Sequence, residues 1–169
     1  MRLQPLALVV CLFVAGCGGA SGHTTIAATQ TTSTAQTSPA AALEQAARTA
    51  IEQNAKVSDY VLSNNAIPSW ASQSTAGPAL AGLRGSAAQR KEAKVRVRVL
   101  ASSVRINSIQ LNPSYLSATA SIVYEGRVRV YKNGHPERRT IRLKEPAHVA
   151  LHRIGNETRF VVWRVAVVK

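Results

Sequence analysis

The residues best suited to acid–base chemistry in this sequence are few. Asp59 is the only aspartate, and Tyr60 follows it directly. A carbon-acid isomerase needs a base in an apolar pocket and a hydroxyl or protonated acid that stabilises the enolate. Adjacent residues on a helix point in different directions, so this pair would not converge. We therefore expect Asp59 to face solvent and the protein to be non-enzymatic. Tyr115, Tyr124 and Tyr131 fall in strand-like segments, where aromatic side chains usually pack against their neighbours.

Two histidines have a spacing that could hold a metal ion only on a helix. His148 and His152 are four residues apart, but the sequence around them alternates as a strand does. On a strand these positions lie about 13 Å apart, too far to ligate one ion. The sequence supplies no third ligand, no glycine-rich phosphate loop and no nucleophile elbow. We expect no metal and no cofactor.

The N-terminal residues predict export and lipid attachment. Arg2 precedes an apolar run, Leu6–Phe13, which has signal-peptide length and is too short to span a bilayer. Small residues then precede a cysteine, and this pattern resembles the lipobox of signal peptidase II substrates: Val14, Ala15, Gly16 and Cys17. The resemblance implies a diacylated Cys17 at the mature N-terminus, and a protein anchored at the extracytoplasmic face of the cell membrane. The alternative is an ordinary signal peptide that is cut elsewhere.

Composition divides the chain into three parts. Residues 1–16 are the expected signal peptide, and residues 17–38 are the lipidated cysteine and a Thr-, Ser- and Ala-rich tether that lacks the apolar residues needed to fold. Residues 39–169 have the length of a single domain. The only other cysteine, Cys11, lies in the signal segment. The domain is therefore expected to fold without a disulfide.

Arginine dominates the charge of the second half of the chain. The formal net charge is +13, and from Arg84 onward basic residues far outnumber acidic ones. Several basic residues alternate with apolar ones, and neighbouring strands would gather them on one sheet face that binds phosphate groups: Arg96, Arg98, Arg127, Arg129, Arg138, Arg142 and Lys144. The alternative is that these positions simply face water. Export and the scarcity of aromatic residues argue against nucleic acid.

Two helices and then a set of strands are expected to position these residues. Ser38-Pro39 offers an N-cap and a proline at the first helical position, and apolar residues recur at helical spacing to about Leu62. Gly77-Pro78 opens a second helix. The strand-like segments are 95–99, 104–111, 115–131, 138–143, 147–154 and 160–168, with a bulge expected near Glu125-Gly126 and an interruption at Glu145-Pro146.

The order of these elements resembles the nuclear transport factor 2-like, or cystatin-like, superfamily, and more loosely the plastid-division and Mce-associated domains. The resemblance is carried by the helix Leu80–Leu83 running into Val95–Val99 and by the closing segment Arg159–Val165. It implies an α+β fold, in which two N-terminal helices pack on a curved, mainly antiparallel sheet of four to six strands. Some members of this superfamily are isomerases, cyclases or dehydratases that use acidic or histidine residues inside the cone of the sheet.

The sequence therefore supports two functions. The first is a lipid-anchored binding or assembly module at the cell envelope, whose partner is an anionic lipid, a wall polymer or an envelope protein. The alternative is a small-molecule pocket inside the cone, with or without isomerase- or cyclase-like chemistry. A basic surface that binds anions is sensitive to salt, whereas an apolar pocket is not. Salt dependence therefore separates the two functions.

Overall fold

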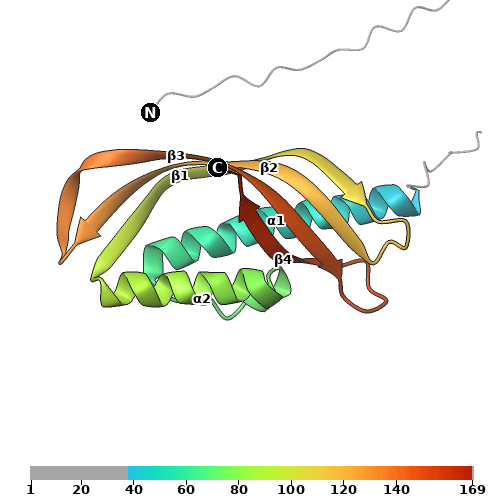
Figure 1. Ribbon diagram of the computed structural model, residues 1–169, viewed down its shortest axis with the longest axis horizontal. Coiled ribbons are helices and arrows are strands. Elements are labelled where there is room, and N and C mark those ends of the chain that lie inside the picture. The colour runs from blue at the N-terminus through green and yellow to red at the C-terminus, as the bar shows by residue number, and fades with distance from the viewer. Residues whose placement is uncertain (1–37, 169) are drawn as a thin grey trace, which may run out of the picture. The chain divides into compact units, whose positions relative to one another are not determined.

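The structure, a computed structural model, describes residues 38–168, without the side chains of Arg138 and Arg139. Two helices and a 3₁₀ turn precede four strands (Figure 1): α1 (Pro39–Asn64), η1 (Ala71–Gln73), α2 (Gly77–Glu92), β1 (Val95–Leu111), β2 (Ser117–Lys132), β3 (His135–Arg153) and β4 (Phe160–Val167). The strands form one antiparallel sheet in the order β1-β2-β3-β4. The predicted fold class, two helices on an antiparallel sheet, is confirmed.

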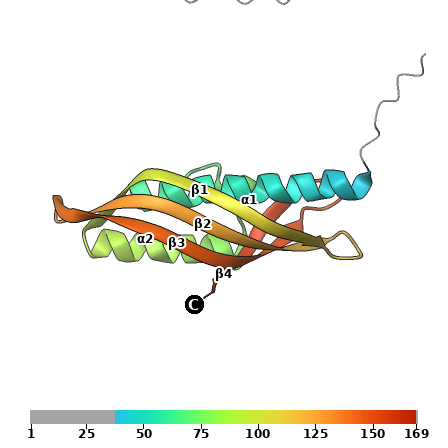
Figure 2. The same cartoon turned by 90° about the horizontal axis from the view of Figure 1, so that it is seen from above.

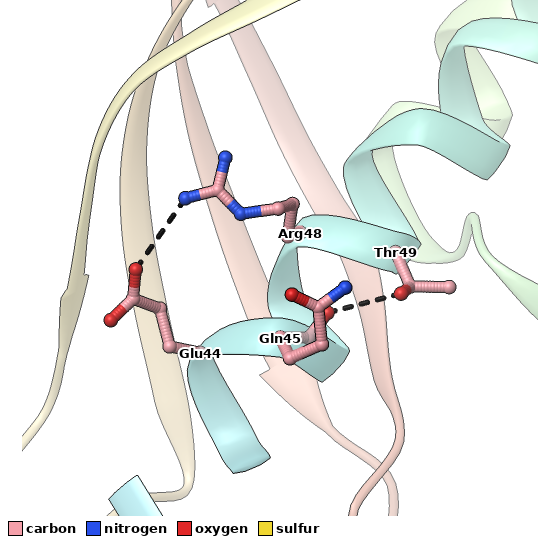
Figure 3. A network of polar contacts seen from close by, with 4 residues as sticks. All are labelled: Glu44, Gln45, Arg48 and Thr49. Carbon is pink, nitrogen blue, oxygen red and sulfur yellow. Dashed lines mark hydrogen bonds and ion pairs between the residues drawn. The ribbon is translucent and has the colours of Figure 1, made fainter. Parts of the chain in front are cut away.

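Helix α1 begins and ends as its sequence predicts. Ser38 caps the N-terminus by accepting a hydrogen bond from the Ala41 N–H at 3.2 Å, and Pro39 follows it. At the other end Asn65 adopts a left-handed conformation with φ of 49° and donates its N–H to the Val61 carbonyl. The solvent side carries local polar contacts (Figure 3), including a 3.5 Å ion pair between Arg48 and Glu44. The opposite side supplies the apolar stripe of the core.

Arg90 joins the two helices to the start of the sheet. Its Nε donates to Asn65 Oδ1 at 2.9 Å, and its Nη2 donates to the Val61 carbonyl at 3.0 Å. Asn65 Nδ2 in turn donates to the Val95 carbonyl at 2.7 Å. The guanidinium thus gives the Val61 carbonyl, which already accepts the Asn65 N–H, a second donor, and through Asn65 it fixes where β1 departs from the helical layer.

Both helices cover the same face of the sheet, and within residues 38–168 no element covers the opposite face (Figures 1 and 2). We call these the inner and outer faces. The main core lies between α1 and the inner face, where Ile51, Leu151, Phe160 and Val162 are almost completely buried. Side chains of alternate strand residues point to opposite faces, so every second residue of β1–β3 is presented on the uncovered side.

Two pairs of predicted strands are continuous in the structure. Segments 95–99 and 104–111 form one strand, β1, because a bulge at Leu100 absorbs the irregularity while pairing with β2 continues. A bulge was expected in the segment that forms β2, near Glu125-Gly126. The structure has it in the neighbouring strand β1, at Leu100. Segments 138–143 and 147–154 are likewise one strand, β3, in which Pro146 pairs with Val123. The Pro146 carbonyl faces β4, where it accepts the Val168 N–H, so the missing N–H of Pro146 costs the β2–β3 ladder nothing.

Candidate functional site: a basic face of the sheet

The register of the strands gathers the predicted basic residues on the outer face. Arg98 of β1 lies opposite Arg129 of β2, and Arg127 of β2 lies opposite Arg142 of β3. All four side chains are exposed. Arg96 and Lys144 occupy the same face at the two ends of this array, and we call the six residues the basic face. The backbone of Arg138 lies in β3, but its side chain falls outside the described residues.

Opposed pairs of like charge are an unfavourable arrangement for a sheet. Residues directly across an antiparallel pair have Cβ atoms about 5 Å apart, and like charges there are destabilising. The carboxylate nearest this array is that of Glu125, which lies 3.8 Å from Lys144. Among the described residues, no other carboxylate forms an ion pair with the basic face. Positive charge is therefore concentrated on this surface and largely uncompensated by the protein itself.

The basic face is hollowed toward its Lys144 end. A depression of about 560 Å³ is lined by Arg127, Arg142 and Lys144 together with Ser103, Gly126 and the acidic Glu125. Gly126 packs closely against β1, since a Cβ there would lie 3.3 Å from the Ala101 carbonyl oxygen. Three cationic side chains around one shallow hollow could donate several charge-assisted hydrogen bonds to a phosphate or carboxylate group.

Two further basic residues on the outer face were missed by the sequence interpretation. Arg105 pairs with Val123 and Arg164 pairs with Ala150, both in outward-facing rows. Arg98 and Arg105 are an odd number of residues apart, so simple alternation puts them on opposite faces. The extra residue at the Leu100 bulge reverses this and returns Arg105 to the outer face. No signal in the sequence marks the position of that bulge.

Asp59 does not face solvent as expected. It is half-buried and accepts hydrogen bonds from the Tyr124 hydroxyl at 2.6 Å and from the Ser102 hydroxyl. Burial raises the pKa of Tyr124, and the hydrogen bond to Asp59 and the charge of that carboxylate raise this pKa further. Tyr60, the neighbour of Asp59, takes no part in this cluster and packs edge-to-face against Trp70. The sequence interpretation was wrong here because the partners of Asp59 come from other elements.

A small cavity lies between α1 and the inner face. Its volume is about 190 Å³, and its walls are mainly apolar side chains such as Ile51, Ile122 and Val165. Tyr124 and Glu145 are the ionisable groups among its lining residues. Typical pockets for small organic ligands measure about 300–1,000 Å³, so this cavity suits only a molecule of a few atoms.

The two histidines occupy the outer face of β3. His148 pairs with Ser121, and His152 stacks on Trp163 with ring centroids 4.9 Å apart and an interplanar angle of 4°. Across residues 38–168, no group of three His, Cys, Asp or Glu residues is arranged to hold a metal ion.

The predicted lipid-attachment residues Val14, Ala15, Gly16 and Cys17 lie outside the described residues. Within the described part, neither helix is long and apolar enough to cross a membrane.

Comparison with known proteins identifies a shared fold. The structure is similar to the intermembrane space region of the chloroplast protein ARC6, with a TM-score of 0.62 and 11% sequence identity, over 73% of this chain and 95% of that one. No protein-family model matches the chain, and no curated protein matches it in sequence. At such low identity the likeness concerns the fold alone. This chain therefore shares an α+β fold with a domain of the chloroplast intermembrane space.

Proposed function

We propose that this protein is a lipid-anchored, non-enzymatic binding module at the extracytoplasmic face of the cell membrane. Cys17 carries the lipid, and the basic face contacts the phosphate groups of an anionic membrane surface. The observation that carries the proposal is the pair of like-charge contacts, Arg98 with Arg129 and Arg127 with Arg142, on the uncovered face of the sheet. An anionic surface relieves their repulsion. We also propose that the domain is of the nuclear transport factor 2-like type, which the order of elements supports.

The anchor and the basic face would act together. Each basic residue close to an anionic leaflet contributes about 1 kcal/mol of attraction. Arginine also matches phosphate through two parallel hydrogen bonds, which lysine cannot form. If residues 17–38 form the tether that their composition predicts, its root-mean-square length is about 25 Å. The lipid therefore holds the domain within reach of headgroups, where individually weak contacts become effective.

Vesicle binding by the full chain carrying Cys17→Ser tests this proposal without the lipid. We expect it to bind vesicles that contain phosphatidylglycerol, to ignore purely zwitterionic vesicles, and to lose most binding between about 50 and 300 mM NaCl because salt screens the contacts. Changing Arg98, Arg127 and Arg129 to Gln should weaken binding by about a hundredfold, since each contributes about 1 kcal/mol.

A matched variant tests the location of the surface. Lys56, Arg84 and Lys91 are exposed basic residues of the helical layer, and changing all three to Gln removes the same net charge. This variant should bind nearly as tightly as the parent chain. Equal weakening by both triple variants would contradict a defined basic face. Soluble polyphosphate serves as a competitor in the same assay. If it abolishes vesicle binding even at low salt, the ligand of the basic face is a phosphate polymer instead of a lipid.

The inner cavity supports a second candidate, a small-molecule site. Its favourable feature is the half-buried hydrogen bond between Tyr124 and Asp59, since Tyr124 also lines this largely apolar space. Two observations weigh against catalysis there. The volume is small, and Asp59 is not among the residues that line the cavity. A catalytic base must lie within hydrogen-bond reach of its substrate.

A further inference from the structure

The edge of β3 is open over half its length. Pairing with β4 begins at Ala147, and the last contact is the hydrogen bond from the Val168 N–H to the Pro146 carbonyl at 2.9 Å. From Thr140 to Glu145, β3 is paired with β2 alone within the described residues. Six residues of extended chain span about 20 Å, the length of an average strand. An unpaired edge of this length is a template for another strand.

The backbone groups at this edge can be identified from the register. In a strand, the N–H and C=O groups of alternate residues point to the same side. Pro146 directs its carbonyl toward β4, so Lys144, Arg142 and Thr140 direct their N–H and C=O groups to the same, unoccupied side. Prolines lie at positions 136 and 146, outside this six-residue segment. Three consecutive donor–acceptor pairs are therefore available.

The side chains along the edge differ between the two faces. Arg142 and Lys144 are exposed on the outer face, next to Arg127 and the rest of the basic face. On the inner face Ile141 is 42% exposed, and Val167, at the end of β4, is 56% exposed, whereas the acidic Glu145 is exposed at the end of this row. A strand added here would therefore meet cationic side chains on one face and, from Ile141 to Leu143, apolar side chains on the other.

We propose that this edge binds an extended segment of a partner protein in which acidic residues alternate with apolar ones. Main-chain hydrogen bonds to Arg142 and Lys144 supply affinity, and the alternation supplies specificity. Two other occupants fit the charges poorly. A second copy of the chain would bring the same basic edge against itself, and like charges across strands are destabilising. The segment Gly18–Ser38 of this chain contains no acidic residue.

A synthetic peptide of alternating glutamate and valine is the probe, measured by fluorescence anisotropy with the full chain carrying Cys17→Ser. We expect it to bind at least tenfold more tightly than a peptide of the same composition with its glutamates and valines in two blocks. An alternating lysine–valine peptide should not bind. Equal binding of the alternating and block peptides would overturn the proposal, because simple charge attraction would then explain the result.

A pair of variants separates strand addition from charge. Lys144→Gln removes the charge and keeps the backbone N–H, whereas Lys144→Pro removes both without affecting the β2–β3 ladder, as Pro146 already does. We expect Lys144→Gln to weaken binding severalfold and Lys144→Pro to abolish it. Equal binding by the two variants would overturn strand addition.

Hydrogen exchange in the unmodified domain gives a readout that needs no variant. The amides of Arg142 and Lys144 should exchange more slowly when the peptide is bound. Unchanged exchange at saturating peptide would contradict the proposal, and so would a chain that sediments as a stable dimer through this edge.

Discussion

Asp59 and Tyr124 are far apart in the chain, and their hydrogen bond connects the C-terminal part of α1 to the inner face of β2. The carboxylate is half-buried and has two hydroxyl donors, from Tyr124 and Ser102. A buried acceptor that loses a donor costs more than an average hydrogen bond contributes. This cluster therefore fixes the helix against the sheet, whether or not the adjoining cavity binds a ligand.

Removing the Tyr124 hydroxyl should destabilise the domain. We expect Tyr124→Phe to lower the free energy of unfolding by about 1–2 kcal/mol, because Asp59 then keeps one donor in place of two. Urea unfolding followed by circular dichroism measures this change. Tyr131→Phe is the control, since no hydrogen bond to the Tyr131 hydroxyl is found in the described part of the chain. An equal loss in both variants would show that the Asp59 contact is not the cause.

The raised pKa of Tyr124 also predicts how stability changes with pH. Its folded-state pKa lies above the unfolded value of about 10, so the folded state favours the protonated phenol. The stability that this group contributes is fully present below pH about 10 and is lost as pH rises further. Phenolate absorbance should show a late titration, from Tyr124, above pH about 10. Tyr124→Phe should remove that late titration and flatten the alkaline decline of stability.

At the scale of elements, the helices and the alternation of the strands were predictable, because both depend on local spacing. The apolar stripe of α1 and its Ser38 cap lie in adjacent turns, and the arginines of 96–98 and 127–129 alternate strictly. What the sequence did not reveal depends on distant pairing. Asp59 meets residues of two strands, Pro146 is tolerated because of where β4 ends, and Arg105 changes face because of a bulge.

The pairing of β1 with β2 predicts a conflict between stability and binding. Arg129 lies opposite Arg98, so Arg129→Thr should raise the free energy of unfolding by about 0.5 kcal/mol at low salt. The gain should vanish in about 0.5 M NaCl, where screening already weakens the repulsion. The same change should weaken vesicle binding. A residue kept at a cost in stability usually serves function.

Lys132→Thr is the control for this prediction. Lys132 belongs to the same strand but lies opposite Val95 in β1 and His135 in β3, so its removal relieves no contact with another arginine or lysine. Chemical unfolding of both variants at two salt concentrations makes the comparison. If Arg129→Thr is less stable than the parent chain at low salt, the opposed arginines do not repel, and the basic positions are simply solvated.

At the scale of the whole molecule, the two proposed contacts share Arg142 and Lys144; when a partner strand takes these two side chains, Arg96, Arg98, Arg127 and Arg129 are left for the membrane. If the outer face rests on the membrane, the helical layer faces away from it and the open edge of β3 stays accessible at the side of the sheet (Figure 2). In this proposal the lipid would determine the location, the basic face would determine the orientation, and the backbone edge of β3 would stay open to a partner. A binding module needs no reaction centre for this arrangement, only a fixed orientation at the surface.

The proposed lipid on Cys17 and the basic face differ in strength, so removing them one after the other should lower the share of protein in the membrane fraction in two steps. Two acyl chains anchor a protein stably, whereas basic contacts alone are reversible. Cys17→Ser should therefore move most of the protein from the membrane fraction to the soluble fraction, and should abolish labelling by radioactive palmitate. The small remainder should be extracted by about 0.5 M NaCl, since salt screens its contacts. Adding Arg98→Gln, Arg127→Gln and Arg129→Gln should remove that remainder, whereas Lys56→Gln, Arg84→Gln and Lys91→Gln should not.

A correctly processed Cys17→Ser chain that stays in the membrane fraction at high salt would contradict anchoring through Cys17. A remainder unaffected by the arginine changes would contradict the role of the basic face.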